Sequence, residues 1–316
     1  MGKTIKIGFA FIFCFCFNTG YSCINEYEED YTRLDGSHKH ITNEFEGSDG
    51  YYFSNEIDME VEMKRFHDLK KREDFKGRSD YAAVLLKLGK TKEALEILEN
   101  LVQKYSNEYN IVVNLGTAYE LNNNPELALK YISKAIKLNP LSHNESEWIH
   151  EEILKAKIAL KTNPEYLKQN SILNLKIPGD IKAYYKSLNE EKRLQLFDVK
   201  NQLLWQLKER IALVAPPDPL VADLLFDFAN LVAITESIEI AIPIYNQSLR
   251  YLPENLNEVL ERRDSLIRMT YWTSIRRYIY LLVVISFLFM GLFFLIKRKK
   301  KLKARKEVAR KTMETL

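Results

Sequence analysis

Cysteine is scarce in this chain, with three in 316 residues. Cys14 and Cys16 lie in an apolar run near the N-terminus, and Cys23 follows shortly after it. We expect the first two to leave with a cleaved signal peptide, so Cys23 has no internal partner. The remaining chain therefore cannot be held together by an internal disulfide.

Motifs for catalysis are also lacking. The sequence has no phosphate-binding loop, no nucleophile elbow and no zinc-protease signature. Its carboxylates are scattered in patterns typical of solvated helix faces. We therefore predict that the protein is not an enzyme and uses no cofactor.

Histidine is rare as well, with five in the chain. His38 and His40 are two residues apart without a nearby cysteine, which is a weak metal pattern. A second group could ligate zinc in principle, but we favour a packing role and predict no metal. In that interpretation the first histidine lies near a helix start and the second packs beside Trp148. The second group is His143, Glu147, His150 and Glu151.

Positive charge is confined to the two ends. Residues 297–316 have a net charge of +8 and residues 1–22 of +2, whereas the whole chain has +3. The stretch between them therefore has a net charge of −7. Nucleic-acid binding needs clustered lysine and arginine, so we predict no nucleic-acid partner.

The N-terminus has the pattern of a secretory signal. Lys3 and Lys6 precede eleven apolar residues, and Gly20 and Ser22 are small residues where a signal peptidase cleaves. We assign residues 1–22 to a signal peptide, with an uncleaved anchor as the alternative. Cys23 would then be a candidate lipidation site, although Gly20 stands where a lipoprotein signal normally has leucine.

One uncharged apolar run near the C-terminus is long enough to cross a membrane. Tyr278 to Ile296 is nineteen residues long, and ~1.5 Å per helical residue nearly spans the ~30 Å hydrocarbon core. Aromatic residues precede it, and residues 297–316 form a basic tail. The positive-inside rule places this tail in the cytoplasm and residues 23–275 outside it. We expect a single-pass protein of a bacterial inner membrane, facing the periplasm.

Residues 115–140 contain a spaced signature that resembles the tetratricopeptide repeat, a 34-residue pair of helices. One period earlier, Gly89 and Ala94 match the same frame. One period later, Trp148 to Ala159 can form a capping helix before Pro164. The central signature residues are Leu115, Gly116, Tyr119, Ala128, Ala135 and Pro140.

This resemblance implies an all-α fold, a helical-repeat solenoid followed by one transmembrane helix. We assign residues 76–160 to the repeat array with its capping helix. Residues 220–272 contain a degenerate repeat-like pair and a following helix. Residues 23–75 form an acidic segment that could pack on the first helices, with a leading helix over 56–71. Residues 161–219 form a helical connector with an apolar stripe at Leu196, Leu203, Leu207 and Ile211.

The resemblance also implies a partner site. Tetratricopeptide arrays usually bind a protein or peptide on a concave face lined by the first helix of each unit. In this frame Asp80, Asn114 and Trp148 recur 34 residues apart, with Trp148 either an exposed anchor or a seam residue. The predicted partner-binding residues are Lys76, Asp80, Asn110, Asn114, Thr117, Glu147, Trp148 and Glu151.

The sequence therefore predicts a membrane-anchored scaffold that presents a protein-binding or peptide-binding module outside the cytoplasm. One alternative is a structural subunit of a homo-oligomeric envelope assembly. Another is a sensor that acts with a separate cytoplasmic effector, because the tail is too short for an output domain.

Overall fold

The structure is a computed structural model that describes residues 24–27, 57 and 59–314. The predicted signal peptide and Cys23 lie outside the described residues. The chain divides into two compact units, one ending at Val259 and one beginning at Leu260. The described residues form helices without strands, which confirms the all-α prediction.

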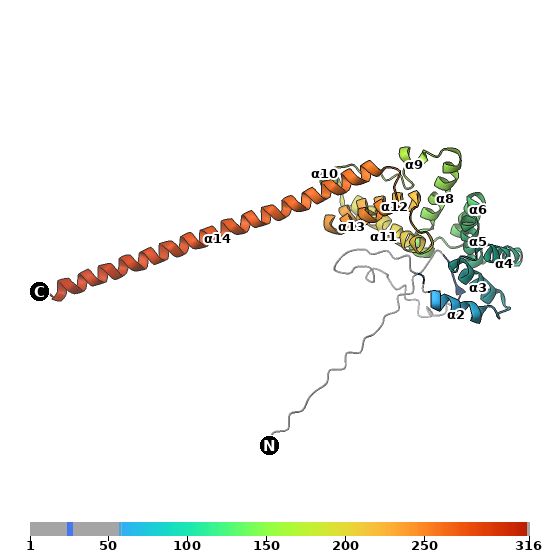
Figure 1. Ribbon diagram of the computed structural model, residues 1–316, viewed down its shortest axis with the longest axis horizontal. Helices are drawn as coiled ribbons and strands as arrows, with labels where there is room; N and C mark the ends of the chain where they lie inside the picture. Colours follow the sequence, from blue (N-terminus) through green and yellow to red (C-terminus); the bar gives the residue numbers. More distant parts are fainter. Residues whose placement is uncertain (1–23, 28–56, 58, 315–316) are drawn as a thin grey trace, which may run out of the picture. The chain divides into compact units, whose positions relative to one another are not determined.

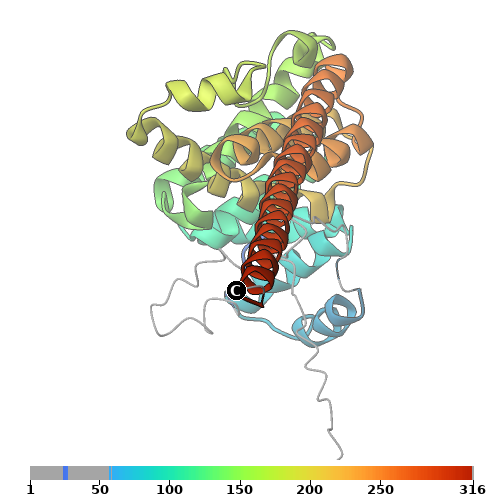
Figure 2. The same ribbon diagram turned by 90° about the vertical axis from the view of Figure 1, so that its left-hand side faces the viewer.

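The first unit begins with helices that pack in chain order, each against the next (Figures 1 and 2). The one exception is α6, which packs mainly against α8. These helices are α2 (Met59–Leu69), α3 (Phe75–Lys87), α4 (Thr91–Lys104), α5 (Tyr109–Leu121), α6 (Pro125–Leu138), α7 (Ser142–Glu145) and α8 (Glu147–Thr162).

Local sequence signals fix where these helices begin. The side chain of Asp74 accepts a hydrogen bond from the backbone N–H of Gly77 and caps α3. Asn124 accepts from Leu127 N–H in the same way, and Pro125 occupies the first turn of α6. Between α3 and α4, Gly89 has a φ of 72°, which a residue with a side chain rarely adopts.

Small residues let α5 and α6 approach closely. A Cβ atom added to Gly116 would lie 2.6 Å from Cδ1 of Ile132, so only glycine fits without a shift. Ala128 and Ala135 of α6 are fully buried. The signature residues of the sequence are thus the residues that set the helix–helix distance.

The rest of the unit contains one long helix and a second tight pair. In α11 the apolar stripe is buried, and α11 packs against α12. The α12–α13 pair is joined by a hydrogen bond of 2.7 Å from the Ser248 hydroxyl to the Ala222 carbonyl. Pro243 lies inside α13. The bounds are α9 (Tyr166–Gln169), α10 (Ile181–Ser187), α11 (Glu190–Leu213), α12 (Pro219–Thr235) and α13 (Ile238–Arg250).

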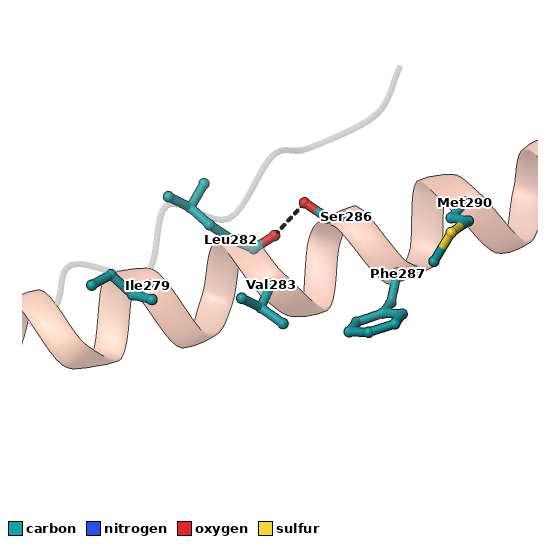
Figure 3. Close-up of a pocket in the computed structure, with 6 residues that line it drawn as sticks. All are labelled: Ile279, Leu282, Val283, Ser286, Phe287 and Met290. Atoms are coloured by element: carbon teal, nitrogen blue, oxygen red, sulfur yellow. Dashed lines mark hydrogen bonds between the residues drawn. The ribbon is translucent and has the colours of Figure 1, made fainter.

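The last helix, α14, runs from Leu256 to Glu314. Its stretch from Leu256 to Lys303 contains an apolar window with a mean hydropathy of 2.9, and none of the residues in that window is buried. The helix is therefore long and apolar enough to cross a membrane. A hollow of about 360 Å³ on this helix is lined by Ile279, Leu282, Val283, Ser286, Phe287 and Met290. Figure 3 shows these six side chains. The Ser286 hydroxyl donates to the Leu282 carbonyl, so the polar side chain of this lining is hydrogen-bonded within its own helix.

Candidate functional site

Four residues from the start of the described chain lie against helices α3 and α5. We call Ile24, Asn25, Glu26 and Tyr27 the N-terminal segment, and we call the surface that it contacts the α3–α5 face. Ile24, Glu26 and Tyr27 are 3%, 2% and 8% exposed. These three side chains are therefore buried like those of the core.

Asn114 of α5 holds the backbone of this segment at two points. Its side-chain oxygen accepts a hydrogen bond of 2.8 Å from the Asn25 N–H, and its side-chain nitrogen donates one of 2.7 Å to the Asn25 carbonyl. One amide side chain thus satisfies both polar backbone groups of a residue, as a neighbouring strand would. This arrangement recognises the backbone of one residue through its N–H and C=O groups.

Asp80 of α3 adds a third backbone contact. Its carboxylate accepts a hydrogen bond of 2.7 Å from the Tyr27 N–H. The Tyr27 ring meets Phe75 edge to face at 5.8 Å, and the Lys76 ammonium lies 5.2 Å from the ring centre. The Tyr27 hydroxyl donates to Glu108 at 3.0 Å. An aromatic side chain is therefore held by its ring and by its hydroxyl.

Glu26 occupies a basic pocket. The Lys87 ammonium lies 2.6 Å from its carboxylate, and the Arg65 guanidinium pairs with both of its oxygens. Lys87 is 8% exposed, and Glu62 lies beside both cations. Burial lowers the pKa of Arg65, against a smaller opposing effect of Asp80. The two cations and two carboxylates balance, so removal of Glu26 would leave one buried positive charge in excess.

A second group of buried charges begins at the other side of Asn25. The His143 Nε2 lies 3.0 Å from the Asn25 side-chain oxygen, and its Nδ1 lies 2.9 Å from Glu147 and 3.2 Å from Glu209. Burial lowers the pKa of His143, but the carboxylates of Glu209 and Glu147 outweigh it, so the pKa is raised well above 6.5. The imidazole is thus a cation at neutral pH.

Glu120 of α5 is the centre of this buried network. Its carboxylate accepts hydrogen bonds from Arg210 at 2.8 Å, Lys157 at 2.6 Å and His150 at 2.6 Å. Burial raises the pKa of Glu120, but the three cations together lower it well below 4.5. The pKa of His150 is raised by the same contact despite burial. These groups join α5, α8 and α11 through fixed charges.

One of the two helices that build this face, α5, belongs to a known repeat. A family model described as tetratricopeptide repeat matches residues 109–140, which are α5 and α6 with their flanks. The chain therefore contains a tetratricopeptide repeat. Comparison with curated proteins returned no match, and comparison with solved structures returned none.

The structure brings some of the predicted partner-binding residues of the repeat array together and separates others. Lys76, Asp80 and Asn114 contact the N-terminal segment directly. Asn110 is buried on α5, and Thr117 donates to the Val113 carbonyl of its own helix. Asn110 and Thr117 both belong to α5, as Asn114 does.

The three predicted residues of α8 have other neighbours. Glu147 is buried beside His143, and the Trp148 indole donates a hydrogen bond of 2.8 Å to Gln202 of α11. Glu151 pairs with Lys155 of its own helix at 3.2 Å. Trp148 therefore packs toward the connector helix.

Sequence reasoning missed Arg65 and Lys87. Arg65 and Lys87 meet Glu26 because α2 and α3 pack side by side. A lysine directly after an apolar run, as Lys87 is after Leu85 and Leu86, was the available signal. His143 was considered with Glu147 in a zinc group, and among the described residues no group of three or more His, Cys, Asp or Glu could hold a metal ion.

Proposed function

We propose that this protein is a membrane-anchored scaffold that binds an extended protein or peptide segment on its α3–α5 face. The two-point contact of Asn114 with the Asn25 backbone supports this proposal most directly. A face that satisfies both backbone groups of an extended residue suits peptide recognition, in which backbone contacts supply affinity and side-chain pockets supply specificity.

The proposal includes the sidedness expected from the sequence. Residues 1–22 act as a signal peptide, α14 anchors the chain, and the basic tail stays in the cytoplasm. The repeat array then faces the periplasm of a bacterial cell, with Cys23 as the candidate lipidation site. The chain acts without catalysis, metal or nucleic acid, and its ligand is a protein.

Sidedness is tested by labelling two single-cysteine variants with a membrane-impermeant maleimide in spheroplasts. Ser187→Cys, on an exposed position of the first unit, is expected to react at once. Leu302→Cys, in the basic tail, is expected to react only after detergent is added. The reverse pattern would place the repeats in the cytoplasm and would overturn this topology.

Partner binding is tested with a photo-crosslinking residue in place of the half-buried Lys76. We expect crosslinks to one other envelope protein, and their loss when Asp80→Ala and Asn114→Ala are added. Crosslinks only between copies of this chain would favour the structural homo-oligomer instead.

A further inference from the structure

The N-terminal segment contacts the α3–α5 face in the way a bound peptide would. Its backbone is held by Asn114 and Asp80 through hydrogen bonds of 2.7 to 2.8 Å. These contacts come from side chains of the repeat helices, so they do not depend on a sheet or helix in the segment itself. The same backbone contacts are available to any extended chain.

The side chains of the segment show which ligand the face accepts. Ile24 lies in the core cluster with Leu69, Tyr81 and Leu85, so this position takes an apolar group. The Asn25 side chain is partly buried, and its oxygen lies 3.0 Å from the His143 Nε2, so this position takes a polar group.

The third position is the most selective. Glu26 pairs with the buried Lys87 and the partly buried Arg65, and a ligand without this carboxylate would lose both ion pairs. A buried charge without a partner is costly, so a neutral or basic group at this position is disfavoured. The fourth position takes an aromatic ring that packs on Phe75 and Lys76 and reaches Glu108 with a hydroxyl.

We infer that the N-terminal segment is an internal ligand that keeps the partner site occupied, and that the partner is a protein with an apolar–polar–acidic–aromatic sequence that must displace it. This inference rests on the proposed function. A self-occupied face binds its partner with an affinity reduced by the fraction of time that the internal ligand is bound.

The test uses full-length protein in detergent and a fluorescein-labelled peptide with the sequence of residues 24–30. We expect Glu26→Ala to bind this peptide at least tenfold more tightly than the wild type, because the internal competitor has lost its ion pairs. Glu126→Ala, which removes an exposed carboxylate paired with Lys161, is the matched control and should keep the wild-type affinity.

The peptide itself carries two further controls that need no change in the protein. One control peptide has glutamine in place of the residue equivalent to Glu26, and the other has an N-methyl group on the residue equivalent to Asn25. Each change should weaken binding to the Glu26→Ala protein at least tenfold. A second measurement uses the wild type alone. Excess unlabelled peptide should speed hydrogen exchange at the Asn25 and Tyr27 amides.

The outcomes separate this inference from the proposed function. Equal binding of the peptide to the wild type and to Glu26→Ala, with unchanged exchange at Asn25, would leave a peptide-binding face but refute the internal ligand. No binding to the Glu26→Ala protein would refute peptide recognition by the face itself. A dimer in light scattering that Glu26→Ala dissociates would assign the segment to a second copy and overturn the intramolecular form.

Discussion

Glu120 and Arg210, which are 90 residues apart in the sequence, form a buried two-point ion pair with distances of 2.8 and 3.3 Å. Glu120 belongs to the matched repeat unit and Arg210 to the long helix α11. Each side chain is 5% exposed. The pair therefore joins the repeat array to the connector helix α11 by charge. Each group takes the place of the water that burial removes from the other.

We expect Glu120→Gln to destabilise the first unit by roughly 3–5 kcal/mol, since it removes the buried carboxylate that Arg210, His150 and Lys157 share. Urea unfolding followed by the fluorescence of Trp148 and Trp205 would measure this change. Glu126→Gln is the control, because the Glu126–Lys161 pair is exposed and should contribute little. A similar midpoint for both variants would show that the buried pair is not stabilising.

Part of this architecture could be predicted from the sequence because local rules determine it. Asn124 and Pro125 mark the start of α6, and Gly116 marks the close crossing of α5 and α6. The period of 34 residues predicted which positions of α3 and α5 share a face. Asp80 and Asn114 do contact the same segment, at residues 27 and 25.

The remaining part depends on contacts between distant residues, which no local pattern encodes. Glu26 and Lys87 are 61 residues apart, and their pairing follows from the path of a segment without regular structure. His143 points at Asn25 because three successive residues, His143 to Glu145, have φ values of 50° to 61°. Such left-handed residues without glycine are not foreseeable from composition.

The close approach of Gly116 and Ile132 predicts a packing penalty for Gly116→Ala. The added methyl would lie 2.6 Å from Ile132 Cδ1, and overpacking costs about 1–3 kcal/mol, of which the better helix propensity of alanine returns about 1. We expect a net loss of roughly 1 kcal/mol in urea unfolding. Adding Ile132→Val removes Cδ1, so the double variant should lose less than the sum of both single changes. Strict additivity would contradict the clash.

The histidines predict a loss of stability at alkaline pH. His143 and His150 have folded-state pKa values raised above 6.5 by Glu209, Glu147 and Glu120, although burial opposes this. Their contribution is complete below about pH 6.5 and is lost as the pH rises through the folded-state values. We expect the unfolding free energy to fall over this window. His143→Gln with His150→Gln should be less stable at pH 6 and should flatten the fall, and an unchanged slope would refute the charged state.

Asp223 predicts a second, more acidic pH window with a different cause. This carboxyl of α12 is 9% exposed, accepts a hydrogen bond of 2.8 Å from the Ile172 N–H and lies near Glu258. Burial raises its pKa to about 7, against the opposing effect of that hydrogen bond, and the charge of Glu258 adds to the rise. The folded state therefore holds a proton that the unfolded state loses near pH 3.8, and stability decreases as the pH rises toward 7.

Asp223→Asn keeps an oxygen that can accept from Ile172 but cannot ionise. We expect this variant to be more stable than the wild type at pH 8, by on the order of 1 kcal/mol, and this difference to be smaller at pH 5, where the carboxyl is still protonated in the folded wild type. Asp180→Asn is the control, since Asp180 is an exposed helix cap. Urea midpoints at both pH values decide the matter. Equal destabilisation by Asp223→Asn at pH 5 and pH 8 would mean that Asp223 is ionised in the folded protein and acts as a charged acceptor for Ile172.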